Sequence, residues 1–319
     1  MSSIPYSRYI VGPVPWYSFL IVAGVVLAIV LACRGVRRTA LPRDTVIDLA
    51  LWLLPFGIAG ARIYYVIFSW NSFQDDFLSV FRIWEGGLAI YGGIIAGVIV
   101  LLVFCRVRKL QPLLLCDIIV PGLALAQCIG RWGTGFNMEA YGFTVKDPRL
   151  CFFPFAVQIP ADGYTWHLAA FFYESLWDFL VFLYLVIARR KLFLRDGDAF
   201  FSYLFLYGAG RLVIEQMRTD SLYLGPEEWG IRVSQVIGIV SVLAGAILLY
   251  WVSRHRPVKV AEAETKEDLP IETITMNDDA SEENAGEAEE KTEEKPEEPE
   301  EKPEEPETKE EKADEKENG

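Results

Sequence analysis

The chain has 319 residues, a formal net charge of −13 and 52% hydrophobic residues, and these averages hide two unlike parts. Residues 261–319 hold 26 acidic and 7 basic side chains, a net charge of −19, which leaves residues 1–260 with a net charge of +6. The first part holds all nine Trp and repeated apolar runs of about twenty residues, which exclude a water-soluble globular domain.

Seven apolar segments are long enough to cross a bilayer, because a helix needs about 20 residues to span the hydrocarbon layer. We expect these spans at 17–33, 46–68, 88–105, 113–132, 167–188, 199–218 and 233–252. The predicted fold class is an all-α polytopic membrane protein with about seven transmembrane helices. Residues 1–260 would form this membrane domain, and residues 261–319, which lack aromatic residues, would form a disordered acidic tail.

The basic residues predict the orientation, because Lys and Arg are retained in cytoplasmic loops. The segments after the first, third, fifth and seventh spans hold 14 Lys and Arg, and the opposite side holds six. We therefore expect the N-terminus outside the cell and the tail in the cytoplasm.

The five Cys and two His are not spaced like a metal site or a disulfide framework. We expect no metal, no cofactor and no nucleic-acid partner.

Charged residues lie inside four of the predicted spans, where each costs about 2.5–3.5 kcal/mol. They are Arg62, Asp117, Arg131, Arg211 and Glu215, with Glu174 and Asp178 as a second group. At about 1.5 Å per residue, the arginines at 62, 131 and 211 fall at one level in the outer half, beside Tyr17 and Tyr91. Converging guanidinium groups indicate a phosphate ligand. Two alternatives stay open: arginines that reach the interface from a helix end, and a purely structural ion network.

Segment 130–142 reads GRWGTGFNMEAYG and resembles the G-R-x-G-N-F-x-N-x-E-x-x-G signature of the prolipoprotein diacylglyceryl transferases. Thr134 and Gly135 stand where that signature has Asn and Phe. Segments 84–93 and 207–218 are similar to the family's W-x-G-G-x-x-x-H-G-G and Y-G-x-x-R-x-x-x-E-x-x-R runs, with Tyr91 in place of His. The Trp16–Tyr17 pair and the Phe-Tyr-Glu sequence at 172–174 also match family elements.

The resemblance implies a transferase in the bacterial plasma membrane with its active site facing the outer leaflet. Such an enzyme moves the diacylglyceryl group of phosphatidylglycerol to the lipobox cysteine thiol of a prolipoprotein. It forms a thioether and releases glycerol phosphate. The lipid bilayer, phosphatidylglycerol and the lipobox segment are then the expected partners.

Carried over residue by residue, the resemblance implies two sets of site residues. The catalytic candidates are Arg131, Arg211, Tyr91 and Glu139. The substrate-binding candidates are Tyr17, Arg131, Thr134, Asn137, Gly142, Tyr207 and Glu215. The base that accepts the thiol proton stays open among Tyr91, Glu139 and Glu215, because a neutral phenol with a reference pKa of about 10 cannot act as a histidine does. Gly135 and Gly142 are expected to shape a turn towards Arg131, and residues 135–166 an external cap that receives the prolipoprotein.

Two functions of other classes remain as alternatives. A transporter or channel for an organic anion would use the same arginines as counter-charges, but it predicts internal repeats, which we do not find. A non-catalytic lipid-binding or scaffold protein would act through its acidic tail, whose partner the sequence does not identify.

Overall fold

The computed structural model describes residues 9–11, 14–74, 76–139, 141–188, 195–219, 223, 230 and 232–255. The predicted acidic tail and several basic loop residues, among them Arg189, Arg190 and Lys191, lie outside the described residues. The described helices are α1 (Trp16–Val36), α2 (Thr45–Phe68), α3 (Ile90–Arg108), α4 (Pro112–Phe136), α5 (Ala170–Ala188), α6 (Asp198–Ile214) and α7 (Val233–His255).

Short elements connect these helices. Two antiparallel strand pairs are β1 (Tyr9–Val11) with β2 (Val14–Pro15), and β3 (Ala156–Ile159) with β4 (Thr165–Leu168). Single 3₁₀ turns are η1 (Trp70–Ser72), η2 (Phe77–Phe81), η3 (Ile83–Glu85), η4 (Pro148–Leu150), η5 (Pro160–Asp162) and η6 (Glu215–Met217).

Within the described residues, six helices are long and apolar enough to cross a membrane, and α6 is close to them with 17 residues. The predicted class, an all-α polytopic membrane protein, is confirmed. Several predicted span limits differ from the helix ends, and two of the predicted spans run into other elements. The fifth span was placed from His167, but His167 and Leu168 belong to β4, because the apolar sequence runs without a break from strand into helix. The sixth was extended to Arg218, which instead has extended backbone after η6.

Small residues let pairs of helices pack closely, as is typical of membrane helices. A Cβ on Gly92 of α3 would overlap the Gly60 oxygen of α2, and one on Gly208 of α6 would lie 2.7 Å from the Gly238 oxygen of α7. Asp117 of α4 fixes the start of α6, because its carboxylate accepts the Gly197 N–H at 2.7 Å and the Phe200 N–H at 2.9 Å. This intramembrane acid therefore has a structural role.

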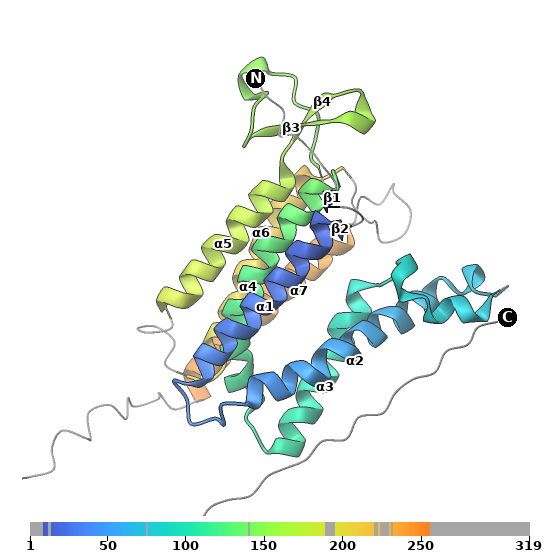
Figure 1. The fold of residues 1–319 in the computed structure, drawn as a ribbon. Coiled ribbons are helices and arrows are strands. Elements are labelled where there is room, and N and C mark those ends of the chain that lie inside the picture. Colours follow the sequence, from blue (N-terminus) through green and yellow to red (C-terminus); the bar gives the residue numbers. More distant parts are fainter. Residues whose placement is uncertain are drawn as a thin grey trace, which may run out of the picture. The chain divides into compact units, whose positions relative to one another are not determined.

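Helices α2 and α3 form a pair that meets α1 and α4 mainly at one end. Buried side chains of all four helices gather there, around Val46, Leu49, Phe104 and Leu115. Figure 1 shows that the pair diverges from the other helices towards its opposite end.

The cap is the segment 141–168, which contains β3 and β4 and lies over the ends of α4 and α5 (Figure 1). Its buried residues Val157 and Ile159 pack with Phe171 and the half-buried Trp132. The prediction of a turn at Gly135 was wrong. Gly135 lies within α4, where a Cβ would be 2.7 Å from the Phe171 ring, and the chain turns at Met138, with a φ of 58°.

Candidate active site

Glu174 of α5 lies at the centre of a group of buried ion pairs. Its side chain is 3% exposed. One carboxylate oxygen is 2.8 Å from Arg131 Nη1 of α4, and the other is 2.7 Å from Arg211 Nη1 of α6. Arg218, just after η6, places its Nη1 3.7 Å from the second oxygen. A single carboxylate therefore gathers three guanidinium groups that are distant in sequence.

Two further carboxylates complete the group. Glu215, which is 1% exposed, lies 2.9 Å from Arg211 Nη2 and 3.7 Å from Arg218 Nη1, and its backbone oxygen accepts a hydrogen bond from Arg232. Asp178 Oδ2 is 3.9 Å from Arg131 Nε. We call this set the ion-pair cluster: Arg131, Glu174, Asp178, Arg211, Glu215, Arg218 and Arg232. Three of its arginines form ion pairs with the three carboxylates, and Arg232 adds a fourth guanidinium, bound to a backbone oxygen.

Hydrogen bonds between helices hold the cluster in register. Ser175, next to Glu174, accepts the indole N–H of Trp132 at 3.0 Å and donates to the Cys128 oxygen at 2.9 Å. These two bonds fix α5 against the turn of α4 that carries Arg131. On α6, the Trp177 indole donates to the Leu206 oxygen at 3.0 Å, one turn before Gly210 and Arg211.

A cavity of about 10 Å³, room for one water molecule, lies beside the cluster, and its lining includes both Arg131 and Arg211. Tyr207 also lines it and stacks on Tyr203, with ring centroids 5.5 Å apart. The three side chains therefore border one small space in this structure. Their partner Glu174 keeps the two guanidinium groups in place before any ligand arrives, which is the preorganisation that electrostatic catalysis requires.

Three other expected binding residues lie at the same end of α4. The Tyr17 ring packs on α4, where a Cβ on Gly133 would be 3.0 Å from Tyr17 Cδ2. The Thr134 hydroxyl donates to the Arg131 oxygen at 2.7 Å, so it braces the helix turn that carries that arginine. Asn137 ends α4, and its Oδ1 is buried with no hydrogen-bond partner among the described residues. A buried polar atom of this kind calls for a partner, which a substrate can supply.

The structure does not bring Tyr91 or Glu139 to the cluster. Tyr91 is in the first turn of α3, a helix that packs on α2. Glu139 is exposed just past α4, and its backbone N–H donates to the Thr134 oxygen at 3.0 Å. Within the described part of the chain, neither side chain forms a hydrogen bond or an ion pair with a cluster residue.

Gly142 lies between the cap and the end of α6. Its N–H donates to the Leu168 oxygen at 2.9 Å, and it forms an antiparallel bridge with Arg218. A Cβ there would be 2.8 Å from the Met217 oxygen, so the close approach requires glycine.

The structure separates Arg62 from the other arginines with which it was expected to converge. Its guanidinium donates to backbone oxygens of the segment between α2 and α3, at 2.8 Å to Val80, 2.6 Å to Gly86 and 2.6 Å to Ser79. It also lies over the Phe73 ring, 5.2 Å from the centroid. Arg62 is thus a clamp for this loop.

Glu174, Asp178 and Arg218 were absent from the expected site residues, although the structure places them in the cluster. A signal was present: Glu174 and Asp178 are four residues apart, on one face of an otherwise apolar helix.

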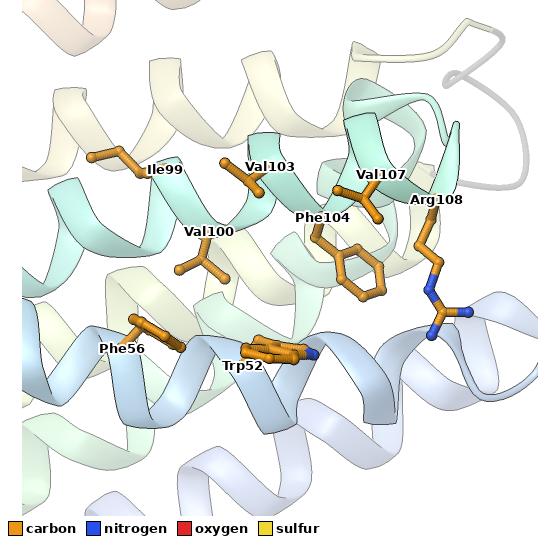
Figure 2. Close-up of a pocket in the computed structure, with 8 residues that line it drawn as sticks. All are labelled: Trp52, Phe56, Ile99, Val100, Val103, Phe104, Val107 and Arg108. Atoms are coloured by element: carbon orange, nitrogen blue, oxygen red, sulfur yellow. The ribbon is translucent and has the colours of Figure 1, made fainter.

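A larger cavity, of about 550 Å³, lies elsewhere, between α2 and α3. Figure 2 shows Trp52 and Phe56 on one helix facing Val100 and Phe104 on the other, with Arg108 at one end. Arg108 pairs with Asp48 at 2.6 Å. Apart from Arg108, which is paired with Asp48, the lining of this cavity is apolar, so it lacks the converging polar groups that a reaction on a phosphate needs.

The fold and the cluster define a class: a polytopic α-helical membrane protein with a preorganised arginine site at one end of its bundle. The sequence model of the prolipoprotein diacylglyceryl transferase family matches residues 7–251. The chain belongs to this family.

Named relatives agree over most of their length. A phosphatidylglycerol–prolipoprotein diacylglyceryl transferase of Streptococcus equi subsp. zooepidemicus is 43% identical over 244 residues, which cover 76% of this chain and 91% of the relative. The protein of that name from Limosilactobacillus reuteri is 43% identical over 257 residues, covering 77% and 90%. The one from Streptococcus agalactiae is 41% identical over 252 residues, covering 77% and 95%.

Proposed function

We propose that Arg131 and Arg211 bind the phosphate of phosphatidylglycerol while the protein transfers the diacylglyceryl group to the lipobox cysteine of a prolipoprotein. As a member of its family, the protein is a diacylglyceryl transferase of lipoprotein maturation. The observation that carries the assignment of roles is the meeting of the two guanidinium groups on Glu174, beside one cavity.

The chemistry explains why cations are needed. The cysteine sulfur attacks the glyceryl carbon, and a C–S bond forms as the bond from that carbon to the phosphate oxygen breaks. The electron pair leaves with glycerol phosphate, whose negative charge grows in the transition state. Guanidinium groups fixed in a site that excludes water stabilise this charge more strongly than they would in water.

The thiol proton must pass to a base, because the thiolate is the nucleophile. Glu215 is already engaged by Arg211 and Arg218, which leaves it a poor candidate. Tyr91 and Glu139 are not engaged in the cluster. We assign the proton to one of these two, and separate Tyr91→Phe and Glu139→Gln variants decide between them: the variant that loses turnover identifies the base.

We place the cluster and the cap at the outer leaflet of the bacterial plasma membrane. The opposite ends of α1, α3 and α7 carry Arg34, Arg106, Arg108 and Arg254 in their last turns, as cytoplasmic ends do. The cap then faces the side from which a secreted prolipoprotein arrives, and the orphaned Asn137 oxygen offers a contact for its backbone or for lipid.

The test is transfer by the purified protein. The protein in detergent is mixed with phosphatidylglycerol and a lipobox peptide, and the lipid-shifted peptide is measured by mass spectrometry. We expect product with the whole chain and with residues 261–319 deleted, and none with Arg131→Ala or Arg211→Ala. No product from the whole chain, under conditions where the Streptococcus equi relative works, would exclude the proposed reaction. A deletion as harmful as Arg131→Ala would favour the scaffold hypothesis.

A further inference from the structure

We propose that His167 is a positioning residue, which as a doubly protonated imidazolium clamps Gly142 and thereby holds the cap against the ion-pair cluster. The proposal rests on the proposed function for its kinetic consequence, but its structural part is tested separately. His167 lies in β4, and its side chain is buried at 4% exposure.

Both ring nitrogens of His167 face oxygen atoms. Nδ1 is 3.0 Å from the Gly142 backbone oxygen, and because a carbonyl only accepts hydrogen bonds, Nδ1 carries a proton. Nε2 is 2.8 Å from Asp162 Oδ2 and 2.8 Å from Thr165 Oγ1. These last two atoms are themselves 2.6 Å apart. Three polar atoms therefore form a closed triangle.

Counting protons in this triangle gives the charge of the ring. The Thr165 hydroxyl has one proton, which it donates to Asp162. If Nε2 lacked a proton, its lone pair would face a carboxylate oxygen at 2.8 Å. A proton on Nε2 removes this repulsion and satisfies all three atoms. Since Nδ1 is protonated as well, the ring is an imidazolium.

A proton on Asp162 is the other way to relieve the contact. Asp162 is exposed, and hydrogen bonds from Thr165 and His167 lower its pKa below the usual value. Its carboxyl is therefore ionised at neutral pH. Among the residues that the structure describes, the other titratable group that faces the ring is Tyr141, with ring centroids 4.8 Å apart. The strand neighbours Val157 and Thr144 carry no charge.

The clamp connects the cap to the cluster through three residues. Gly142 is held by Leu168 and His167 on one side, and the next residue, Phe143, donates its N–H to the Met217 oxygen at 3.1 Å on the other. Arg218 follows Met217 and reaches Glu174 and Glu215. A neutral ring has one N–H and can keep the bond to Gly142 or the bond to Asp162, but not both. Deprotonation therefore removes one of the two contacts by which the ring ties Gly142 to the rest of the cap.

The protonation state is measured directly, because the chain has only two histidines. His255→Gln leaves His167 as the single histidine, and ¹⁵N NMR of the labelled protein in detergent reports both ring nitrogens. At pH 7.5 a histidine in a peptide, with a pKa of about 6.5, is mostly neutral. We expect His167 to carry both protons at that pH and to lose one in the Asp162→Asn variant. A singly protonated ring in the unmutated cap would overturn the proposal.

Kinetics then test the positioning role. His167→Ala removes the clamp, and His167→Asn keeps an N–H near the Nδ1 position without the charge. We expect the transfer rate of His167→Ala to fall about 10- to 100-fold, the range for a hydrogen bond to a charged group, with His167→Asn between it and the unmutated protein. The ratio of the unmutated rate to the His167→Asn rate should fall as pH rises, because only the unmutated protein has an imidazolium to lose. Thiol ionisation affects both proteins alike and cancels in this ratio.

The two levels of failure are distinguishable. An unmutated protein without transfer refutes the proposed function, whereas the NMR result stands independently. Equal rates for His167→Asn and the unmutated protein at every pH would refute the positioning role. Hydrogen exchange of β3 and β4 identifies a variant whose cap has unfolded. Such a variant is replaced in the comparison by Asp162→Asn, which keeps the imidazole but removes the carboxylate that faces Nε2.

Discussion

Two arginine sites at similar expected depths are built in different ways. Arg62 is held by backbone oxygens of a single loop and by an aromatic ring. Arg131 and Arg211 are held by the carboxylate of Glu174, from a third helix, and line a cavity. The first arginine organises the loop between two helices that follow each other in sequence. The pair Arg131 and Arg211 joins three helices beside a small space.

The contrast shows that the role of a buried arginine is inferred from the groups that bind it. Backbone oxygens accept the hydrogen bonds of the Arg62 guanidinium, and these bonds fix a loop. The role of this guanidinium is therefore structural. Carboxylates that gather several guanidinium groups hold these donors side by side, an arrangement that suits a ligand phosphate. The following substitutions test whether the two sites differ in function as they do in construction.

The largest effect is expected for lysine at the cavity. Arg131→Lys and Arg211→Lys keep the charge but lose the planar fork that matches a phosphate. We expect the transfer rate to fall about 10²- to 10³-fold, as when a preorganised donor is removed from a transition state. The transfer rate of Arg62→Lys should fall by less than about tenfold, because Arg62 acts only through the loop that it holds. The measurement is peptide lipidation under single-turnover conditions, and equal losses at all three positions would erase the contrast.

Glu174→Gln should mainly affect stability. It leaves the buried cations without their shared counter-charge, and breaking such a buried pair costs about 3–5 kcal/mol. The matched control is the exposed Glu139→Gln, which should stay within about 0.5 kcal/mol of the unmutated protein. The stabilities of both variants are measured by unfolding in detergent, with the accessibility of a buried cysteine as the signal. A Glu174→Gln protein as stable as its control would mean that the carboxylate is not the centre of the cluster.

Arg62→Gln tests the loop clamp. It removes hydrogen bonds that a charged donor makes to several carbonyls, each worth about 1.5–3 kcal/mol. We expect faster hydrogen exchange in residues 79–87 and unchanged exchange at the cluster end of α5. Arg82→Lys is the control, because the Arg82–Asp76 pair is exposed and such pairs contribute about 0–1 kcal/mol. Faster exchange throughout the protein would show that the loop and the cluster are one cooperative unit.

The smallest effect is expected from pH at the exposed cap. The pKa of Asp162 is lowered in the folded protein, so its ionised form adds stability that is complete above the unfolded-state pKa of about 3.9. This contribution is lost as pH falls through the lowered pKa. Protection of β3 and β4 from hydrogen exchange should therefore weaken at acid pH, and less so in Asp162→Asn. An identical acid response in both proteins would show that the carboxylate does not stabilise the cap.

Much of the fold could be predicted because lipid demands long apolar helices with paired backbone groups. The second span was expected at 46–68 and the helix is Thr45–Phe68. The predicted span limits were wrong where the chain leaves the membrane helices. His167 and Leu168 continue an apolar stretch of sequence, but they pair in a strand. Gly135 was assigned to a turn, yet small residues also serve close helix packing, and sequence alone does not separate the two uses.

The site was partly predictable for a related reason. Counting 1.5 Å per residue gives the depth of a side chain but not the direction in which it points. Arg131 and Arg211 were expected at one level and do share Glu174, whereas Arg62 at a similar expected depth points to its own loop. The central role of Glu174 depends on how α4, α5 and α6 pack, which is a tertiary property.

Direct measurement of bound lipid tests the central claim, that Arg131 and Arg211 together hold a glycerophospholipid phosphate. Native mass spectrometry of the purified protein, titrated with phosphatidylglycerol, compares the unmutated chain with Arg131→Ala, Arg211→Ala and Arg62→Lys. We expect affinity to fall about tenfold or more in the first two variants, the loss of at least one charged hydrogen bond, and to change little in the third. Full retention of the lipid by Arg131→Ala and Arg211→Ala would contradict the account.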